Sequence, residues 1–130
     1  MGSRISEYRS TYRRVENICQ IEESRTAYTI INYIYRNYEQ DISAKGVAQA
    51  FGMTVERLNQ VLLCQVERSF NEFLNLVRVN RASEMLIETD KSVIDIAYEV
   101  GYRSPKTFSR NFLHLQKMTP REYRAARNRQ

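Results

Sequence analysis

Between residues 104 and 117, four side chains recur at the spacing that places them on one face of a helix. Lys106, Ser109, Arg110 and Leu113 stand at i, i+3, i+4 and i+7, and residues three or four apart are neighbours on a helical surface. In the major groove of DNA, arginine and lysine donate to guanine, and serine bonds to several base edges. Arg110 is therefore the best candidate for a two-pronged contact to guanine, and Lys106 for guanine or phosphate.

A second polar face precedes it, between residues 54 and 66. Its outward side chains include Glu56, Asn59 and Gln60. The amides can pair with adenine, and the carboxylate can accept from cytosine. Arg57 is the one basic residue of this segment. We expect this face to discriminate between bases while adding little affinity, because basic side chains provide most of the attraction to phosphates.

The two faces belong to two copies of one sequence pattern. The segments 47–53 and 96–102 each contain an alanine and a glycine, which are 49 positions apart between the copies, and the apolar residues Leu58 and Phe108 follow 50 positions apart. Glycine makes a sharp turn at low steric cost, so each copy predicts helix, turn, helix. In such a unit the second helix enters the major groove with its N-terminal end first.

The elements that must position these faces are helices. No segment alternates as a strand would, and apolar residues recur at helical spacing instead. Helix starts are marked by N-terminal capping residues: Ser43, Thr54, Ser69, Ser92, Ser104 and Thr119. The expected fold is all-α and homeodomain-like, with two helix-turn-helix subdomains, a long linker helix and about seven helices in total.

The linker helix is expected to run from residue 69 to residue 88. This segment contains no glycine or proline, so nothing in it favours a kink. About 20 residues of helix span roughly 30 Å, close to the ~34 Å of one DNA turn. We therefore expect a rigid spacer between two DNA-reading units. The expected division is 1–26 (a linker or helix of open role), 27–68 (first subdomain), 69–90 (linker helix) and 91–130 (second subdomain with a basic C-terminal helix).

The chain carries a net charge of +5, but this charge is unevenly distributed. Residues 91–130 hold nine Lys/Arg against three Asp/Glu, whereas residues 27–90 hold six against eight. We expect the second copy to dominate attraction to phosphates. Phosphate contacts are expected from Thr54, Arg103, Ser104, Thr107 and Arg121.

Several other function classes are not favoured. His114 is the only histidine, and it has no partner at catalytic or metal-ligand spacing, so we expect no enzyme activity, no metal and no cofactor. No apolar run approaches the roughly 18 residues of a membrane span. Cys19 and Cys64, without a secretion signal, indicate reduced thiols and a cytoplasmic, nucleoid-associated location.

The first 26 residues leave two interpretations open. An apolar series at heptad spacing, from Ile5 to Cys19, is compatible with a helix that forms a dimer seam. It is also compatible with a linker that belongs to a longer parent protein.

The second copy contains the most specific motifs: residues 92–97, Gly101-Tyr102, residues 108–112 and residues 118–124. With Arg81-Ala82 and Met85-Leu86, these motifs resemble the DNA-binding domain of the AraC/XylS family of bacterial transcription regulators over about residues 27–125.

The resemblance implies that both recognition helices enter successive major-groove segments on one face of the duplex. It places groove-facing positions at Glu56, Asn59, Gln60, Pro105, Lys106, Ser109 and Arg110. It also implies transcription activation through RNA polymerase, and it raises the question of an upstream effector or dimerisation domain. The oligomeric state is left open.

The sequence departs from the family pattern in three respects. Glu67 and Lys117 stand where a glycine usually follows each recognition helix, which requires a left-handed backbone there or a different turn. Gln60 stands where arginine is frequent. Leu63, Cys64 and Leu113 stand where lysine or another polar residue is frequent. Three placements are open for the two leucines: in contact with thymine methyls, in contact with a protein partner, or packed inward. Inward packing is our first expectation.

The sequence therefore predicts a sequence-specific, double-stranded DNA-binding regulator that reads two successive major-groove segments. The alternative is a protein-interaction module, such as an anti-activator or co-regulator, with weak or no DNA binding. The acidic first half motivates this alternative.

Overall fold

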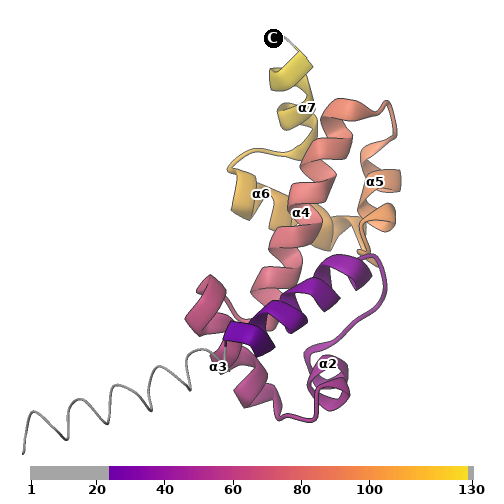
Figure 1. Cartoon of the computed structure of the whole chain (residues 1–130). Coiled ribbons are helices and arrows are strands. Elements are labelled where there is room, and N and C mark those ends of the chain that lie inside the picture. Colours follow the sequence, from indigo (N-terminus) through magenta and orange to yellow (C-terminus); the bar gives the residue numbers. More distant parts are fainter. Residues whose placement is uncertain (1–23, 129–130) are drawn as a thin grey trace, which may run out of the picture.

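A computed structural model of the chain describes residues 24–128, and side chains up to residue 127. The described residues form seven helices and no strand, as the sequence predicted (Figure 1). A first helix covers residues 24–37 and is followed by α2 (Ala44–Ala50), α3 (Val55–Val66), α4 (Phe70–Glu88), α5 (Val93–Glu99), α6 (Pro105–Gln116) and α7 (Pro120–Asn128). The heptad series from Ile5 to Cys19 lies outside the described residues.

The helices begin where short polar side chains replace the missing backbone acceptors. The hydroxyl of Ser43 accepts from the Gly46 amide at 3.0 Å, and that of Thr54 accepts from the Arg57 amide at 3.1 Å. Ser69 and Glu72 form a reciprocal capping box, and the hydrogen bond with Ser69 lowers the pKa of Glu72. Ser92, Ser104 and Thr119 cap the later helices in the same way. All six predicted caps are confirmed, because each depends on residues within one helical turn.

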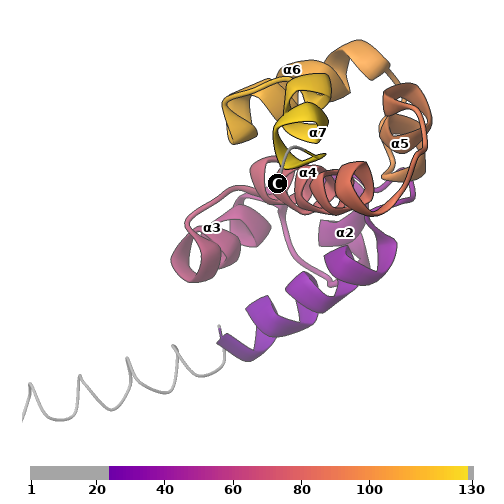
Figure 2. The same ribbon diagram turned by 90° about the horizontal axis from the view of Figure 1, so that it is seen from above.

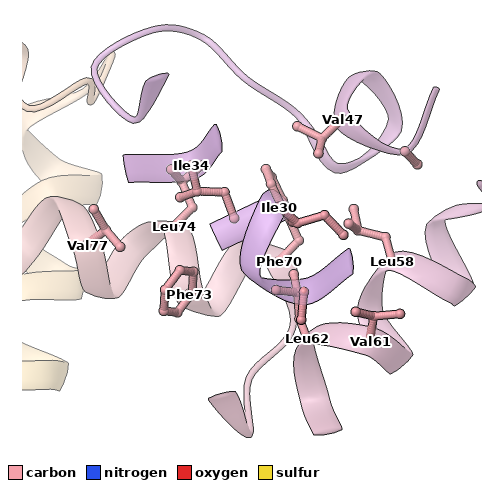
Figure 3. Packing of buried hydrophobic residues seen from close by; sticks show 12 residues of the cluster. Ile30, Ile34, Val47, Leu58, Val61, Leu62, Phe70, Phe73, Leu74 and Val77 are labelled. Atoms are coloured by element: carbon pink, nitrogen blue, oxygen red, sulfur yellow. The ribbon is translucent and has the colours of Figure 1, made fainter. Parts of the chain in front are cut away.

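Two hydrophobic clusters form the core, and α4 contributes to both. The N-terminal half of α4 packs Phe70, Phe73, Leu74 and Val77 against residues of the first helix, α2 and α3 (Figure 3). The C-terminal half contributes Val79, Ala82, Met85 and Leu86 to a cluster with α5 and α6. Since one straight helix supplies both clusters, the orientation of the two halves depends on α4 and on the contacts around its middle.

Arg78 lies at the middle of α4 and ties the two halves together. Its Nε donates to the Tyr38 carbonyl at 2.8 Å, and its Nη2 donates to the Gln40 carbonyl at 2.9 Å. Its guanidinium also lies 5.5 Å from the centre of the Tyr102 ring. Burial lowers the pKa of Arg78 from its ordinary value and raises that of Tyr102. The arginine therefore contacts a loop of the first half and a ring of the second half at once.

The turn before α6 closes tightly on this arginine. Gly101 has a φ of +109°, and a Cβ atom added there would lie 2.5 Å from the Tyr38 carbonyl oxygen. Asn75 of α4 accepts from the Tyr102 hydroxyl at 2.9 Å. An exposed ion pair between Arg103 and Asp41 adds a further link between the halves. Gly101 therefore permits the sharp turn, as expected, and also lets the backbone approach the Tyr38 carbonyl closely.

The sequence spacing predicts that most tyrosines occupy core positions, and the described tyrosines divide between core and surface. Tyr102 is buried, and Tyr33, Tyr38 and Tyr123 pack against the core. Tyr35 was also expected on the buried side of the first helix, together with Ile30 and Ile34. The two isoleucines are fully buried there, but Tyr35 is 55% exposed and meets the Phe73 ring edge-on, and Tyr28 and Tyr98 are also exposed. Tyrosine keeps its hydroxyl in water while its ring covers the core edge, which apolar spacing alone does not reveal.

None of the described helices is long and apolar enough to cross a membrane.

Candidate nucleic-acid interface

The polar face of α6 is presented by the packing of its other side. Phe108 and Phe112 are fully buried, with ring centres 5.7 Å apart. A helix that is held by this stripe turns its opposite face to solvent. Lys106, Ser109 and Arg110 are accordingly exposed. The predicted base-contacting residues of the second copy thus share one accessible surface.

The face of α3 is built in the same way. Leu58 and Leu62, at the positions that Phe108 and Phe112 take in α6, are fully buried. Glu56, Arg57 and Gln60 are exposed on the other side. The two recognition helices therefore share one register of buried and exposed positions, although their polar side chains differ in charge.

Asn59 has a structural role that the sequence did not suggest. Its side-chain oxygen accepts from the Phe70 amide at 2.9 Å, so it caps the N-terminus of α4 from the preceding helix. The side chain is half-buried. A bidentate contact to adenine would use the amide nitrogen as donor and the same oxygen as acceptor, and the base contact of Asn59 stays a prediction.

Two of the predicted phosphate-binding hydroxyls cap their own helices. Thr54 accepts from the Arg57 amide, and Ser104 accepts from the Thr107 amide at 3.5 Å. A hydroxyl that accepts in this way keeps its own hydrogen to donate. Capping is therefore compatible with a phosphate contact at either helix start. Thr107 is half-buried.

The basic residues near the ends of this surface are engaged to different degrees. Arg103 is exposed and pairs with Asp41, so a phosphate would compete with that carboxylate. Arg121, in the first turn of α7, is exposed. Arg127 lies over the Tyr123 ring, 5.5 Å from its centre.

Arg124, in the basic C-terminal helix, does not belong to a solvated face. Its Nε donates to the Leu86 carbonyl at 2.9 Å, and its Nη2 donates to the Thr89 carbonyl at 3.2 Å. These carbonyls belong to the C-terminal end of α4, where helices leave acceptors without internal partners. Arg124 thus fastens α7 to α4. Arg129 lies outside the described residues.

Both recognition helices end in a left-handed residue that is not glycine. Glu67 has a φ of 58° and Lys117 a φ of 63°. Each amide donates to the carbonyl four residues earlier, Leu63 and Leu113 respectively. A left-handed turn therefore follows each recognition helix, and Glu67 and Lys117 adopt a backbone conformation that glycine would adopt with less strain.

The leucines of the recognition helices do not pack inward, so our first expectation for them was wrong. Leu63 is 49% exposed and Leu113 is 48% exposed. Cys64 and His114 are exposed beside them. Helical spacing explains this outcome, because both leucines lie off the stripe of α3 and α6 that faces the core.

The two recognition helices extend to the same side of α4. The C-terminal ends of α3 and α6 both project to the left of α4 in Figure 1 and again in Figure 2, which views the molecule at 90° to the first. Among the described residues, no cluster of His, Cys, Asp or Glu has the arrangement of a metal site. The surface offers hydrogen bonds, positive charge and two leucines, and these suit the recognition of a duplex groove.

Comparison with known families supports this interpretation. The family model described as a helix-turn-helix domain, of the AraC type, matches residues 47–126. The chain belongs to the AraC family of DNA-binding domains. Members of this family are DNA-binding transcription regulators rather than enzymes.

Individual relatives agree with the family. The lactose operon transcription activator of Staphylococcus xylosus is 32% identical over 94 residues, which cover 72% of this chain and 34% of that protein. An uncharacterised helix-turn-helix transcriptional regulator of Staphylococcus aureus strain COL is 30% identical over 98 residues, covering 75% of this chain and 13% of that protein. The chain therefore spans about a third of the length of the first relative and about an eighth of the length of the second.

Solved structures share the fold. An AraC-type transcriptional regulator from Chromobacterium violaceum is 27% identical, with a TM-score of 0.71 over 80% of this chain and 94% of that one. The DNA-binding domain of AdpA, solved with its target DNA, has a TM-score of 0.73 over 77% of this chain and 90% of that one. At 21% identity, this second likeness shows the fold alone.

Proposed function

We propose that the chain binds a defined operator by inserting α3 and α6 into successive major-groove segments on one face of the duplex. The observation that carries this proposal is the repeated register of the two helices. Each buries a stripe, exposes the opposite face, and projects from the same side of α4 (Figures 1 and 2). The spacer α4 has 19 residues and is therefore about 28 Å long, which is comparable to the ~34 Å repeat of the groove.

In the second unit, Arg110 reads a guanine and Lys106 reads a guanine or contacts a phosphate. Both side chains are exposed on α6, and no described acidic residue lies in its first turn. Ser109, on the same face, contacts a neighbouring base edge. This unit supplies most of the affinity, because the positive charge of the chain is concentrated in residues 91–130.

In the first unit, Glu56 and Gln60 read base edges, with Asn59 and Arg57 at the flanks of the same face. The carboxylate of Glu56 repels phosphates, and its favourable contact in the groove is to the amino group of a cytosine. This unit contributes discrimination rather than affinity.

Phosphate contacts come from the helix starts and the basic residues around them: Thr54, Arg103, Ser104, Thr107 and Arg121. These contacts fix the register of the protein on the duplex without reading sequence.

The wider role is that of a bacterial transcription regulator, and we propose that it activates transcription through RNA polymerase in the cytoplasm. The Staphylococcus xylosus relative is a transcription activator and is about three times as long as the matched segment. In such a protein an additional effector or dimerisation domain would control this DNA-binding domain.

Selection of bound duplexes from a random library tests the proposal. The expected product contains two short motifs about ten base pairs apart, and its affinity falls steeply as salt rises. Selection that enriches no motif, together with salt-insensitive binding to a protein, would favour the protein-interaction module instead.

A further inference from the structure

Leu63 and Leu113 occupy the same place in the two recognition helices. They stand 50 positions apart, as do the buried pairs Leu58/Phe108 and Leu62/Phe112. Their exposures are 49% and 48%. A large apolar side chain is therefore about half exposed twice, at the same helical position.

Each leucine shares the groove face with the polar residues that precede it. Gln60 and Leu63 are three positions apart on α3, as are Arg110 and Leu113 on α6. Residues at this spacing are neighbours along one side of a helix. A helix that brings Gln60 or Arg110 to a base edge also brings the following leucine into or beside the same groove.

Neither leucine belongs to an apolar patch on its own helix. The other exposed large hydrophobic residues of the described chain lie on different helices: Tyr28, Tyr35, Ile87, Ile94 and Tyr98. The exposed neighbours of Leu113 on α6 include Arg110 and His114. A protein-docking surface is usually a contiguous apolar area, whereas a single apolar group among hydrogen-bonding residues suits a base edge.

The major groove contains one apolar group, the C5 methyl of thymine. We propose that Leu63 and Leu113 each read a thymine methyl, so that each half of the operator contains a thymine next to the base read by Gln60 or Arg110. This inference rests on the proposed function and adds a specificity element to it. Three residues of helix rise ~4.5 Å, so each leucine lies about one helical turn from Gln60 or Arg110, and we expect the thymine at a neighbouring base pair.

Uracil provides a direct probe, because it lacks the C5 methyl and keeps the same hydrogen-bonding groups. Each thymine of a selected duplex would be replaced by uracil in turn, and the affinity of the folded chain measured by titration. We expect one sensitive thymine in each half-site, with an affinity loss of about fourfold, the value that burial of one methyl-sized group predicts.

Alanine variants assign each methyl to its leucine. Leu113→Ala should remove the uracil effect in the second half-site and leave it unchanged in the first, and Leu63→Ala should do the reverse. His114→Ala, an exposed neighbour, should leave both effects in place. Both leucines are exposed, so thermal unfolding should confirm that each variant is folded.

The outcomes separate the inference from the proposed function. Equal affinity for thymine and uracil at every position, with specific binding retained, would overturn the reading of methyl groups. A uracil effect that survives both alanine substitutions would also overturn it. Absence of specific binding to any duplex would instead remove the proposed function on which the inference rests.

Discussion

At the scale of single residues, the side chains of the interface differ in how far the free protein already engages them. Lys106 and Arg110 are exposed on α6, so their donors can meet a base edge without breaking a described contact. Asn59 already caps α4, and Arg103 already pairs with Asp41. Lys106 and Arg110 should therefore contribute most of the binding energy, because Asn59 and Arg103 must exchange one hydrogen-bonding partner for another.

The first prediction concerns Arg110. Arg110→Ala should weaken operator binding by about 1–3 kcal/mol and relax the preference at one base pair, since a bidentate contact to guanine is lost. Arg121→Ala is the matched control, and it should weaken all duplexes equally and lower the salt slope by about one. Binding titrations on the operator and its single-base variants would measure both. A uniform loss for Arg110→Ala would show a phosphate contact instead.

The second prediction concerns the left-handed residues Glu67 and Lys117. Glu67→Gly should raise the free energy of unfolding by roughly 0.5 kcal/mol, because relief of left-handed strain slightly exceeds the entropy that glycine adds to the unfolded chain. Glu84→Gly, the same change at an exposed interior position of α4, should lower it by about 1 kcal/mol. Denaturant unfolding would measure the free energy of unfolding of both variants and of the parent chain. A destabilised Glu67→Gly variant would contradict the expected release of strain.

At the scale of elements, much of the fold was predictable because helix starts and helix turns are local. Ser69 and Glu72 lie within one turn and signal a helix start in any context. Contacts between helices were not predictable in the same way. Arg124 belongs to a basic run that resembles a solvated face, and its bonds to the Leu86 and Thr89 carbonyls depend on the position of α4. The capping role of Asn59 also depends on the position of α4, so the sequence indicated only a DNA contact for this residue.

The third prediction separates the two roles of Asn59. Asn59→Ala should lower the free energy of unfolding by about 1 kcal/mol, because the Phe70 amide loses its cap. Asn59→Asp keeps the accepting oxygen and removes the donating nitrogen, so stability should be retained. If Asn59 also reads adenine, the aspartate variant should lose that preference while remaining as stable as the parent. An alanine variant of unchanged stability would contradict the capping role.

At the scale of the whole molecule, the two halves are joined by α4 and by polar contacts at its centre. The burial of Arg78 was not predictable from the sequence, because an arginine in a helix is usually exposed. It is 9% exposed and bonds to two carbonyls that lie 40 and 38 positions earlier in the chain. The spacing of the two reading helices therefore depends on Arg78 as well as on the stiffness of α4.

The fourth prediction tests this link. Arg78→Ala should lower the free energy of unfolding by roughly 2–3 kcal/mol, because two carbonyls lose a charged donor. In the folded fraction, Arg78→Ala should also allow tight binding to operators with a wider range of spacings between the two half-sites. Arg78→Lys should not restore either property, since one ammonium cannot reproduce the planar fork. Arg81→Ala is the control, and its exposed ion pairs with Glu84 and Glu88 should together contribute less than about 1 kcal/mol.

The central claim is that both recognition helices occupy the duplex at once, on one face and about one helical turn apart. Hydroxyl-radical footprinting of the selected operator tests this claim most directly. We expect two protected patches about ten base pairs apart on the same face of the duplex, with both patches lost at high salt. Protection of one short patch by the fully folded chain, or of no patch, would contradict it.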